Sequence, residues 1–540
     1  MTVVALDRVA IGPTAPPRAP VGLAVAGLAI GAGFAAPFVY LLVRNLDGVT
    51  GFLDVVASRE VTEPLWRTLW LAVSVTIACA VVGTTMAWLV TRTDVPGRRF
   101  FAAAAALPLV LPSFVAALAL VSAFAHGGLL EELLGFDTGL RIEGYWAAFT
   151  VLTLISYPYV YLPVAARLVA LPRSLEESAR ALGRRPAAVF RTVVLPQIAG
   201  SVLAGSLLVF LYAVSEFGAV ALLRYDTLTR RIYSARLLDP SAALAMSLLL
   251  GAVALIVVAT ERGITKRRRR VEAAVTGGRP LRARLGPWRV PAFLFAATIV
   301  GLGLLAPVAV LARWAVRGLM GGRNVLGRTS DVGSLVEPTV NTALLAVTAA
   351  VVAVVVVLPV AFLTSRYRSR TGGVANAFVV GGFALPGLVI ALALVSWTLR
   401  SPVLEVFYQT LPLLVFAYVV HFGAQAMRAA QVAVDGVPQR LRDAAQALGA
   451  GRARRVRTVE LPIMMPSLAA GGGLVLLSVM KELPATLLLA PIGVDTLAMQ
   501  IWGAAEEGFF AQAGLAALVL VGLSGVLTWL LTIRRMERLS

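Results

Sequence analysis

The segment Glu177-Ser-Ala-Arg-Ala-Leu-Gly183, which runs on to Leu195-Pro196, has a second copy 266 positions later. The copy reads Asp443-Ala-Ala-Gln-Ala-Leu-Gly449 and ends at Leu461-Pro462. Ten of the 20 aligned residues are identical. Both copies are polar, Arg-containing interruptions in a chain that is 59% hydrophobic. The chain therefore presents one kind of polar surface twice.

The composition predicts a polytopic membrane protein. Mean hydropathy is +0.85, and about 20 apolar residues in a helix cross the hydrocarbon core. We expect an all-α fold with twelve transmembrane helices. The expected spans are 21–43, 66–90, 100–124, 145–169, 197–223, 241–260, 290–312, 340–364, 374–399, 404–427, 464–491 and 509–533.

The repeat extends beyond the polar segment. Arg67–Val73 aligns with Asn341–Val347, and Ala117–Ser122 aligns with Ala391–Ser396, both at a spacing of 274 residues. The spacing then falls to 266, which an outer loop eight residues longer in the first half explains. Each half is thus predicted to hold six spans in the same order and orientation. Such parallel repeats pack about an axis along the membrane normal.

We predict three parts: a first six-span half at 1–260, a basic linker at 261–289 and a second six-span half at 290–540. The linker contains Lys266-Arg-Arg-Arg-Arg270, and the whole chain carries a formal charge of +20. The charge is spread over many loops without interleaved aromatic residues, so we expect contact with anionic membrane lipid and not with nucleic acid.

Lys and Arg in short loops favour the cytoplasmic side of a membrane. Both copies of the polar segment are rich in Arg, whereas residues 493–508 contain three acids and no basic residue. With an even number of spans, we expect a multi-pass cell (plasma) membrane protein with both termini in the cytoplasm. Two predicted outer loops, 224–239 and 313–337, contain four arginines each and break this bias.

The polar segment has the pattern of a short helix, a turn and a second helix. Glu177 and Asp443 lie in the first turn, where an acid suits the positive end of the helix dipole. Gly183 and Gly449 are placed to end the helix in the left-handed conformation. Pro can then begin the next span. A solvated amphipathic loop lying on lipid is the alternative, and duplication with one spacing argues against it.

This pattern resembles the EAA motif of ABC importer permeases, and the resemblance covers the whole chain. Ser178 replaces the middle Ala of the motif, and Asp443 replaces its Glu. The resemblance implies the type I importer permease fold and a coupling segment that docks on ATP-hydrolysing subunits. The implied coupling residues are Glu177, Ala179, Gly183, Leu195, Pro196, Asp443, Ala445, Gly449, Leu461 and Pro462.

A narrower likeness lies in the fifth span of each half. Ser215–Ala219 aligns with Lys481–Thr486, and Met480–Leu489 is similar to the fused ferric-iron permeases. Fused thiamine permeases share much of this segment. Ferric iron is therefore the leading substrate, and thiamine, a polyamine or an inorganic oxyanion are alternatives.

Acids at membrane depth mark candidate functional sites. Glu216 and Glu482, with Ser215 and Lys481, are predicted to line a substrate path or gate near the outer mouth. A structural alternative pairs Glu482 with Lys481 or a nearby Arg. In the following outer loops, Asp226 and Asp495 are expected to contact a binding protein or to cap the loop. His126 and His421 show no metal-ligand spacing, so a metal site stays unknown.

The chain has two lysines, and neither follows Gly, so the sequence lacks a phosphate-binding loop. We therefore expect no enzyme and no cofactor in this chain. The expected partners are two ATP-binding cassette ATPase subunits and an external substrate-binding protein. An ion-coupled secondary transporter is the alternative, but such transporters place acids near the middle of the membrane. A membrane enzyme lacks support because no catalytic cluster is evident.

Overall fold

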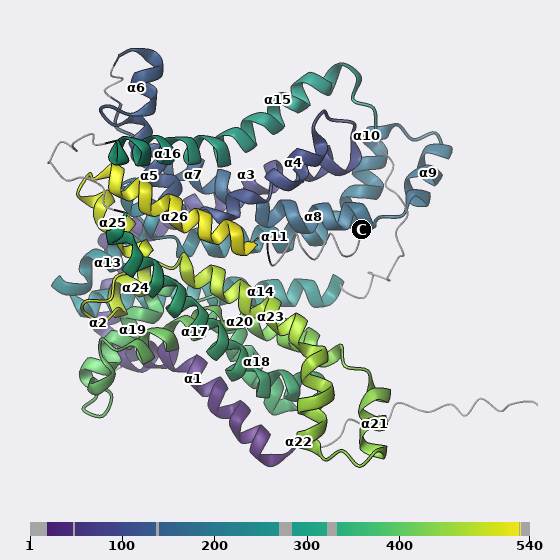
Figure 1. Ribbon diagram of the computed structural model, residues 1–540, viewed down its shortest axis with the longest axis vertical. Helices are drawn as coiled ribbons and strands as arrows, with labels where there is room; N and C mark the ends of the chain where they lie inside the picture. The colour runs from purple at the N-terminus through teal and green to yellow at the C-terminus, as the bar shows by residue number, and fades with distance from the viewer. Residues whose placement is uncertain are drawn as a thin grey trace, which may run out of the picture. The chain divides into compact units, whose positions relative to one another are not determined.

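The computed structural model describes residues 19–46, 49–136, 140–268, 283–320, 332–528 and 530. Within these ranges the chain forms helices joined by loops (Figure 1). Ten described helices are long and apolar enough to cross a membrane, and two bent helix pairs qualify when each pair is taken together. Counting each bent pair as one span gives the twelve expected from the sequence.

The helices, with 3₁₀ or π turns written as η, are α1 (Val21–Leu46), α2 (Val49–Ala57), α3 (Arg59–Arg92), α4 (Arg98–Ala104), η1 (Leu107–Val110), α5 (Ser113–Phe124), α6 (Leu129–Leu134), α7 (Tyr145–Ser156), α8 (Pro158–Ala170), α9 (Arg173–Ala181), α10 (Pro186–Val189), η2 (Phe190–Val194), α11 (Leu195–Ser215), α12 (Gly218–Leu222), α13 (Leu228–Leu238), α14 (Pro240–Arg268), η4 (Gly286–Trp288), α15 (Arg289–Val300), η5 (Gly301–Leu305), α16 (Ala306–Leu319), η6 (Gly333–Leu335), α17 (Val336–Ala361), η7 (Phe362–Arg366), α18 (Arg370–Gly382), α19 (Gly387–Arg400), η8 (Glu405–Phe407), α20 (Leu411–Asp435), α21 (Gln439–Ala447), α22 (Arg452–Arg455), η9 (Val456–Glu460), α23 (Leu461–Met480), α24 (Pro484–Leu489), α25 (Leu497–Glu506) and α26 (Phe510–Thr528).

The chain divides into two compact units. Unit 1 comprises Met1–Ala36, Ala350–Gly382 and Phe422–Val475, and unit 2 comprises Pro37–Ala349, Phe383–His421 and Leu476–Ser540. The division falls inside α1, α17, α20 and α23, and so does not follow the two predicted halves. The predicted linker at 261–289 is described only in part, since residues 269–282 lie outside the described ranges.

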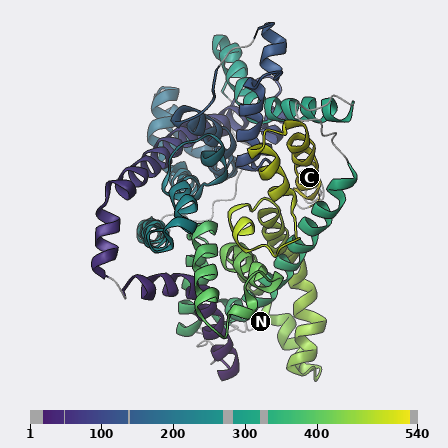
Figure 2. The ribbon, with the colours of Figure 1, turned by 90° about the vertical axis from the view of Figure 1, so that its left-hand side faces the viewer.

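Helix α3 is central to the packing of unit 2, where it contacts α8 and α11. Its inward face buries Leu71, Val75, Cys79 and Met86. Small residues let the helix backbones approach closely, as is common in membranes. A Cβ at Gly83 would lie 2.8 Å from the Tyr157 carbonyl oxygen, and one at Gly205 would lie 2.6 Å from that of Tyr159. Helix α2 packs against α3 and α14 (Figure 2).

The third expected span, 100–124, is not a continuous helix. It is formed by α4 and η1 followed by α5, with a bend of 97°. Pro112 is extended at the break (φ −62°, ψ 147°), because proline lacks the N–H that would continue the helix. Figure 1 places α4 toward the end of unit 2 that carries α9 and α5 toward the opposite end. The corresponding span, 374–399, is likewise broken into α18 and α19, with Pro386 at the N-cap of α19.

Both expected fifth spans are also broken. Residues 197–223 form α11 and α12, and residues 464–491 form α23 and α24, with Glu216 and Glu482 in the breaks. The backbone carbonyls released there have hydroxyl partners: Thr229 donates to Glu216 O at 2.6 Å, and Thr486 donates to Glu482 O at 2.8 Å. The tenth span begins at Leu411, and the expected start at 404 is wrong because residues 401–410 form turns.

Several arginines that break the charge bias are held by protein groups. Arg313 forms an ion pair with Glu132, and both Arg313 and Arg317 donate to the carbonyl of Gly127. Arg231 pairs with Glu60. These contacts give a physical reason for cations in predicted outer loops. Arg323 and Arg328, in the same predicted loop as Arg313, lie outside the described residues.

Replacing Gly205 with Leu should lower the thermal unfolding midpoint of the detergent-solubilised chain. The added side chain would meet the backbone of α8, and such overpacking costs roughly 1–3 kcal/mol or more. Gly522→Leu is the matched control, because a Cβ there has nothing within 4 Å. Equal midpoints for the two variants would contradict the proposed close packing of α8 and α11.

Candidate functional site

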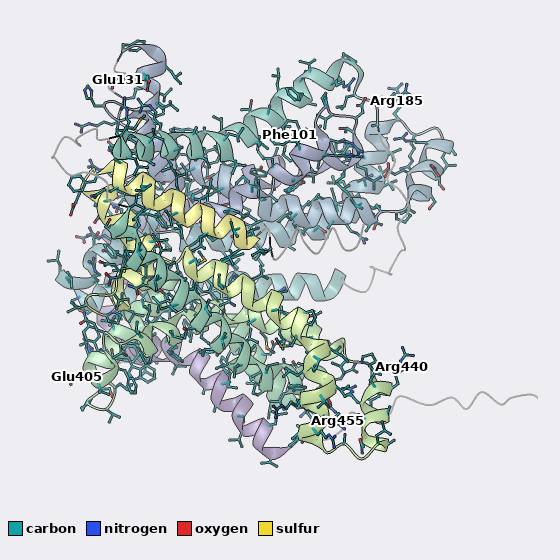
Figure 3. The ribbon with its side chains drawn as sticks, viewed as in Figure 1. Phe101, Glu131, Arg185, Glu405, Arg440 and Arg455 are labelled. Atoms are coloured by element: carbon teal, nitrogen blue, oxygen red, sulfur yellow. The ribbon has the colours of Figure 1, made fainter. Side chains whose placement is uncertain are left out.

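The two polar segments have the same backbone from start to end. Helix α9 begins after Pro172 (φ −64°, ψ 137°), and α21 begins after Pro438 (φ −61°, ψ 134°). Every helix or turn that follows, as far as the start of the next span, begins at the same spacing of 266 residues. Arg185 lies in the first segment and Arg455 in the second, and Arg440 lies at the start of α21 (Figure 3). The duplication in sequence is thus a duplication in conformation.

Each short helix ends in a Schellman motif. Gly183 and Gly449 have φ values of +76° and +77°, as the sequence predicts. The next residue donates back to the helix in both copies: Arg184 N to Ala179 O at 3.2 Å, and Ala450 N to Ala445 O at 3.0 Å. A Cβ at either glycine would have open space around it. Glycine is therefore favoured by the backbone angle and not by crowding.

An exposed leucine precedes the glycine in both copies. Leu182 is 80% exposed, and Leu448 is 88% exposed. Seven residues earlier, Leu175 and Leu441 are 41% and 42% exposed. The same apolar side chain is thus exposed at the same place in both copies.

The Leu-Pro pairs begin the spans that follow. Just before them the chain forms the π turns η2 and η9, in which Leu195 N donates to Phe190 O and Leu461 N donates to Val456 O. Pro196 and Pro462 then stand at the second position of α11 and α23. Each proline lacks the N–H that would continue the regular hydrogen-bond pattern, and the π turn directly before it is where the helix departs from α geometry.

A buried ion pair holds the first segment. Arg92, at the end of α3, donates to Glu176 on α9 and to the Leu168 carbonyl on α8. The side chains of Arg92 and Glu176 are only 1% and 3% exposed. The pair ties three helices together, so displacement of α9 would require α3 or α8 to follow or the pair to break.

The second segment is held by a different pair. Arg366 stands 274 residues after Arg92, the spacing of the second spans, and donates to Glu460 at 3.1 Å. Glu460 also accepts from Arg455 at 2.9 Å. Arg442 stands where the first half has Glu176, and burial together with the Arg366 guanidinium lowers the pKa of Arg442. The two segments share a backbone but not an anchor.

Glu216 has several hydrogen-bond donors around it. It is 6% exposed, and its Oε1 accepts from the Ser113 hydroxyl and from Ala219 N, both at 2.8 Å. Ser113 is the first residue of α5, directly after the break in the third span. The breaks of the third and fifth spans therefore meet at this carboxylate.

Glu482 is 7% exposed and less well satisfied. Its Oε1 accepts from Ala485 N at 3.2 Å, whereas its Oε2 has no hydrogen-bond partner among the described groups. Gly387 stands where the first half has Ser113, and a Cβ there would lie 2.3 Å from Glu482 Oε1. The second half thus replaces a serine donor with open space for the carboxylate.

Lys481 connects the two predicted halves. Its Nζ donates to the Leu109 carbonyl in η1 at 2.8 Å. A lysine of the second half thus binds a backbone carbonyl beside the break in the third span of the first half. Among the described residues neither Lys481 nor any Arg forms an ion pair with Glu482, so the pairing alternative is wrong in this structure. Leu483 approaches to 3.4 Å of a Cβ placed on Gly218, which brings the two fifth-span breaks together. Ser215, aligned with Lys481, ends α11.

The two outer Asp-Thr-Leu segments are anchored alike. Leu228 N donates to Thr68 Oγ1 at 2.8 Å, and Leu497 N donates to Thr342 Oγ1 at 2.9 Å. The side chain of Asp226 lies 3.6 Å from Arg230, and Asp495 accepts from Asn341 through its backbone carbonyl at 3.0 Å. Contact of either aspartate with a binding protein stays a prediction.

Metal ligands are not gathered anywhere in the described residues: no group of three or more His, Cys, Asp or Glu side chains is placed to hold an ion. His126 lies 3.6 Å from Glu131, and the ring of His421 stacks on Phe383 with centroids 6.5 Å apart.

The chain matches the model of the binding-protein-dependent transport system inner membrane component twice, over residues 68–270 and 357–535. The chain belongs to this family of membrane permeases. The Fe(3+)-transport system permease protein FbpB 2 of Haemophilus influenzae is 30% identical over 96% of this chain and 99% of its own. A probable ABC transporter permease of Sinorhizobium fredii, y4fN, is 26% identical over 90% of this chain and 89% of its own. The sulfate permease CysT of Salmonella typhimurium is 36% identical over 31% of this chain and 61% of its own.

The sequence interpretation of this permease missed the ion pairs and the exposed leucines. A signal for one of them was present, because Arg92 and Arg366 end the second span of each half at the same spacing as the aligned apolar residues. The acidic partners of these two arginines stand at different places in the two halves, so aligning the halves does not identify the partners.

Replacing Arg92 with Met should destabilise the permease by about 3–5 kcal/mol, because Glu176 would remain buried without its cation. The double variant Arg92→Met/Glu176→Met should recover most of that loss. Thermal unfolding in detergent measures both effects. A double variant as unstable as the sum of the single variants would show that the two residues do not act as a pair.

Proposed function

We propose that this chain is the transmembrane permease subunit of an ATP-driven, binding-protein-dependent importer for ferric iron. The observation that carries the proposal is the pair of polar segments with one backbone, Schellman ends and exposed leucines. Their place in a family of binding-protein-dependent permeases supports a coupling role. Two ATP-binding cassette subunits would each receive one segment.

Leu182 and Leu448 would insert into the partner, and the glycines after them fix the direction in which the chain leaves the helix. The coupling residues named from the motif are Glu177, Ala179, Gly183, Leu195, Pro196, Asp443, Ala445, Gly449, Leu461 and Pro462. ATP-driven closure of the partners would move α9 and α21. The Arg92–Glu176 pair would then transmit that movement to α3 and α8.

The substrate path would pass the breaks of the third and fifth spans. Irregular backbone at membrane depth is tolerated where it lies inside protein or lines a cavity. Glu216, Lys481 and Glu482 lie at these breaks and supply both signs of charge. Closure of the path would involve the hydrogen bond from Lys481 to Leu109.

Similarity to FbpB 2 over almost the whole chain supports ferric iron as the cargo. An inorganic oxyanion is the second candidate, since the CysT relative shares 36% identity over part of the chain. Thiamine and polyamine remain sequence-based alternatives. The proposed orientation places both polar segments and both termini in the cytoplasm, because the basic loops favour that side.

Leu182→Asp combined with Leu448→Asp should abolish co-purification of the ATPase subunits without loss of folded permease. A charged side chain at each exposed position would oppose burial in an apolar groove. Leu237→Asp combined with Leu238→Asp is the control, since those leucines are 78% and 91% exposed on α13, at the other end of unit 2. Retention of the ATPase by the Leu182/Leu448 variant would argue against the coupling assignment.

The cognate external binding protein should carry ferric iron when isolated from cells. Metal analysis of the purified binding protein measures this, and its complex with the permease confirms the pairing. Thiamine, a polyamine or sulfate as the bound ligand, with no affinity for iron, would rule out the ferric assignment but leave the permease assignment intact.

A further inference from the structure

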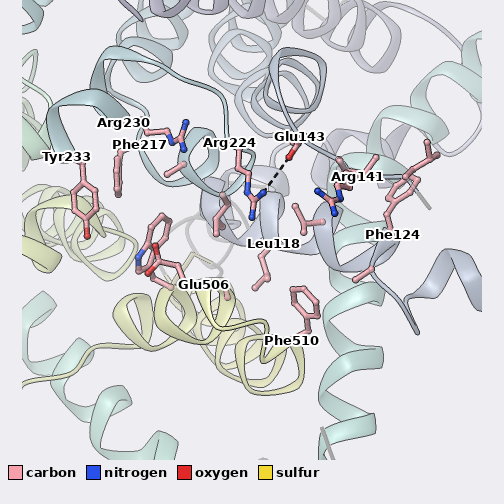
Figure 4. A pocket seen from close by; sticks show the side chains of 18 of the residues that line it. Leu118, Phe124, Arg141, Glu143, Phe217, Arg224, Arg230, Tyr233, Glu506 and Phe510 are labelled. Carbon is pink, nitrogen blue, oxygen red and sulfur yellow. Dashed lines mark ion pairs between the residues drawn. The ribbon is translucent and has the colours of Figure 1, made fainter. Parts of the chain in front are cut away.

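A cavity of about 870 Å³ (Figure 4) is lined by residues of α5, α13 and α25, which lie at the end of unit 2 opposite α9 (Figure 1). Its volume lies within the range of small-molecule sites, which is roughly 300–1,000 Å³. The wall is built by the outer end of α5, the loop at 140–143, α12, α13 and α25. It therefore combines segments from both predicted halves of the chain, as a substrate entrance would.

Three arginines line this cavity: Arg141, Arg224 and Arg230. Two of them lie near acids at 3.9 Å (Arg224 to Glu143) and 3.6 Å (Arg230 to Asp226). Both distances exceed those of N–H···O hydrogen bonds, so the guanidinium donors stay available to a ligand. Arg141 forms no ion pair with any described acid. The arginines outnumber the two lining glutamates, Glu143 and Glu506.

Arg224 stands in a conformation that usually belongs to glycine. Its φ is +52°, and it closes a Schellman motif in which Tyr225 N donates to Val220 O at 2.9 Å. The same place in the two polar segments is occupied by Gly183 and Gly449. A non-glycine residue in the left-handed region strains the backbone, and such residues often mark functional positions. Position 224 thus carries an arginine side chain where glycine would strain the backbone less.

Aromatic rings form the floor of the cavity. Phe217 lies 4.6 Å from Tyr233 and 5.4 Å from Trp502 between ring centroids, and Phe217 is 1% exposed. Glu216 precedes Phe217 and is buried against Ser113. The arginine-lined space and the buried carboxylate are therefore neighbours along the chain, and the aromatic cluster separates them.

The donors in this cavity suit an anion. Guanidinium groups bind carboxylate, phosphate and sulfate oxygens through paired N–H donors. The lining arginines outnumber the lining glutamates by one, and no group of three ligating side chains among the described residues is placed to hold a bare ferric ion. Ferric iron bound by polycarboxylate oxygens carries net negative charge and offers carboxylate oxygens to arginine.

We propose that this cavity receives the cargo as an anion, namely an oxygen-ligated ferric complex, with Arg141, Arg224 and Arg230 binding the ligand's oxygens. The inference rests on the proposed ferric import and adds the chemical form of the cargo. A free oxyanion such as sulfate shares this binding chemistry, so the experiment must separate the two.

Equilibrium binding of ferric citrate labelled with radioactive iron to the purified full-length chain in nanodiscs tests the proposal. The wild-type chain should bind ferric citrate, and Arg141→Gln and Arg230→Gln should each weaken binding roughly tenfold, as expected when a charge-assisted hydrogen bond is lost. The affinity of Arg230→Lys should lie between those of the wild type and Arg230→Gln, since lysine keeps the charge but loses the planar donor pair. Arg231→Gln is the matched control, because Arg231 pairs with Glu60 and does not line the cavity.

Iron-free citrate and sulfate are measured in parallel. Ferric citrate should bind more tightly than either, and its advantage should be lost in Arg141→Gln. Arginine-dependent binding of sulfate without binding of ferric citrate would overturn the assignment. Equal affinity of all variants for ferric citrate would overturn it too. Because the ATPase is absent from this assay, failure here with intact ATPase co-purification would reject the anionic cargo alone.

Discussion

Every backbone polar group within the hydrocarbon must find a partner inside the protein. This permease breaks its third and fifth spans and so creates groups that the helices themselves cannot satisfy. The partners are polar side chains that donate hydrogen bonds to backbone carbonyls. Lys481 donates to the carbonyl of Leu109, Thr229 to that of Glu216, and Thr486 to that of Glu482. One of these bonds also joins two breaks, since Lys481 lies at a fifth-span break and Leu109 precedes the break in the third span. The polar centre of the molecule is a consequence of how its helices are interrupted.

Duplication gives two copies of the polar segment and of the broken fifth span, and the two copies differ in their buried charged residues. The first half pairs Arg92 with Glu176, whereas the second pairs Arg366 with Glu460. Ser113 donates a hydrogen bond to Glu216, whereas Gly387, at the corresponding place, has no side chain and leaves space for the Glu482 carboxylate. Exposed features, by contrast, are kept alike in both copies: the glycine turns and the leucines before them. The proposed docking of one partner type on both segments would explain the likeness of the surfaces.

Much of the coupling region could be predicted from the sequence, because its features are local. A glycine that follows a short run of helix formers predicts a left-handed turn, and Gly183 and Gly449 confirm it. Pro112 is itself a local signal for the break in the third span, whereas no proline marks the break at Glu216. The Arg92–Glu176 pair joins residues 84 positions apart, and no periodicity connects them. The partners of the arginines in the predicted outer loops, such as Glu60 for Arg231 and Glu132 for Arg313, lie far away in the sequence and could not be predicted either.

The central claim is that two polar segments connect a permeation path to ATP hydrolysis in partner subunits. Accumulation of labelled ferric iron in proteoliposomes tests it most directly, with the chain, its ATPase and the loaded binding protein reconstituted together. The account predicts accumulation that requires ATP and stops when the ATPase is omitted. Accumulation driven by an ion gradient without ATPase would contradict it.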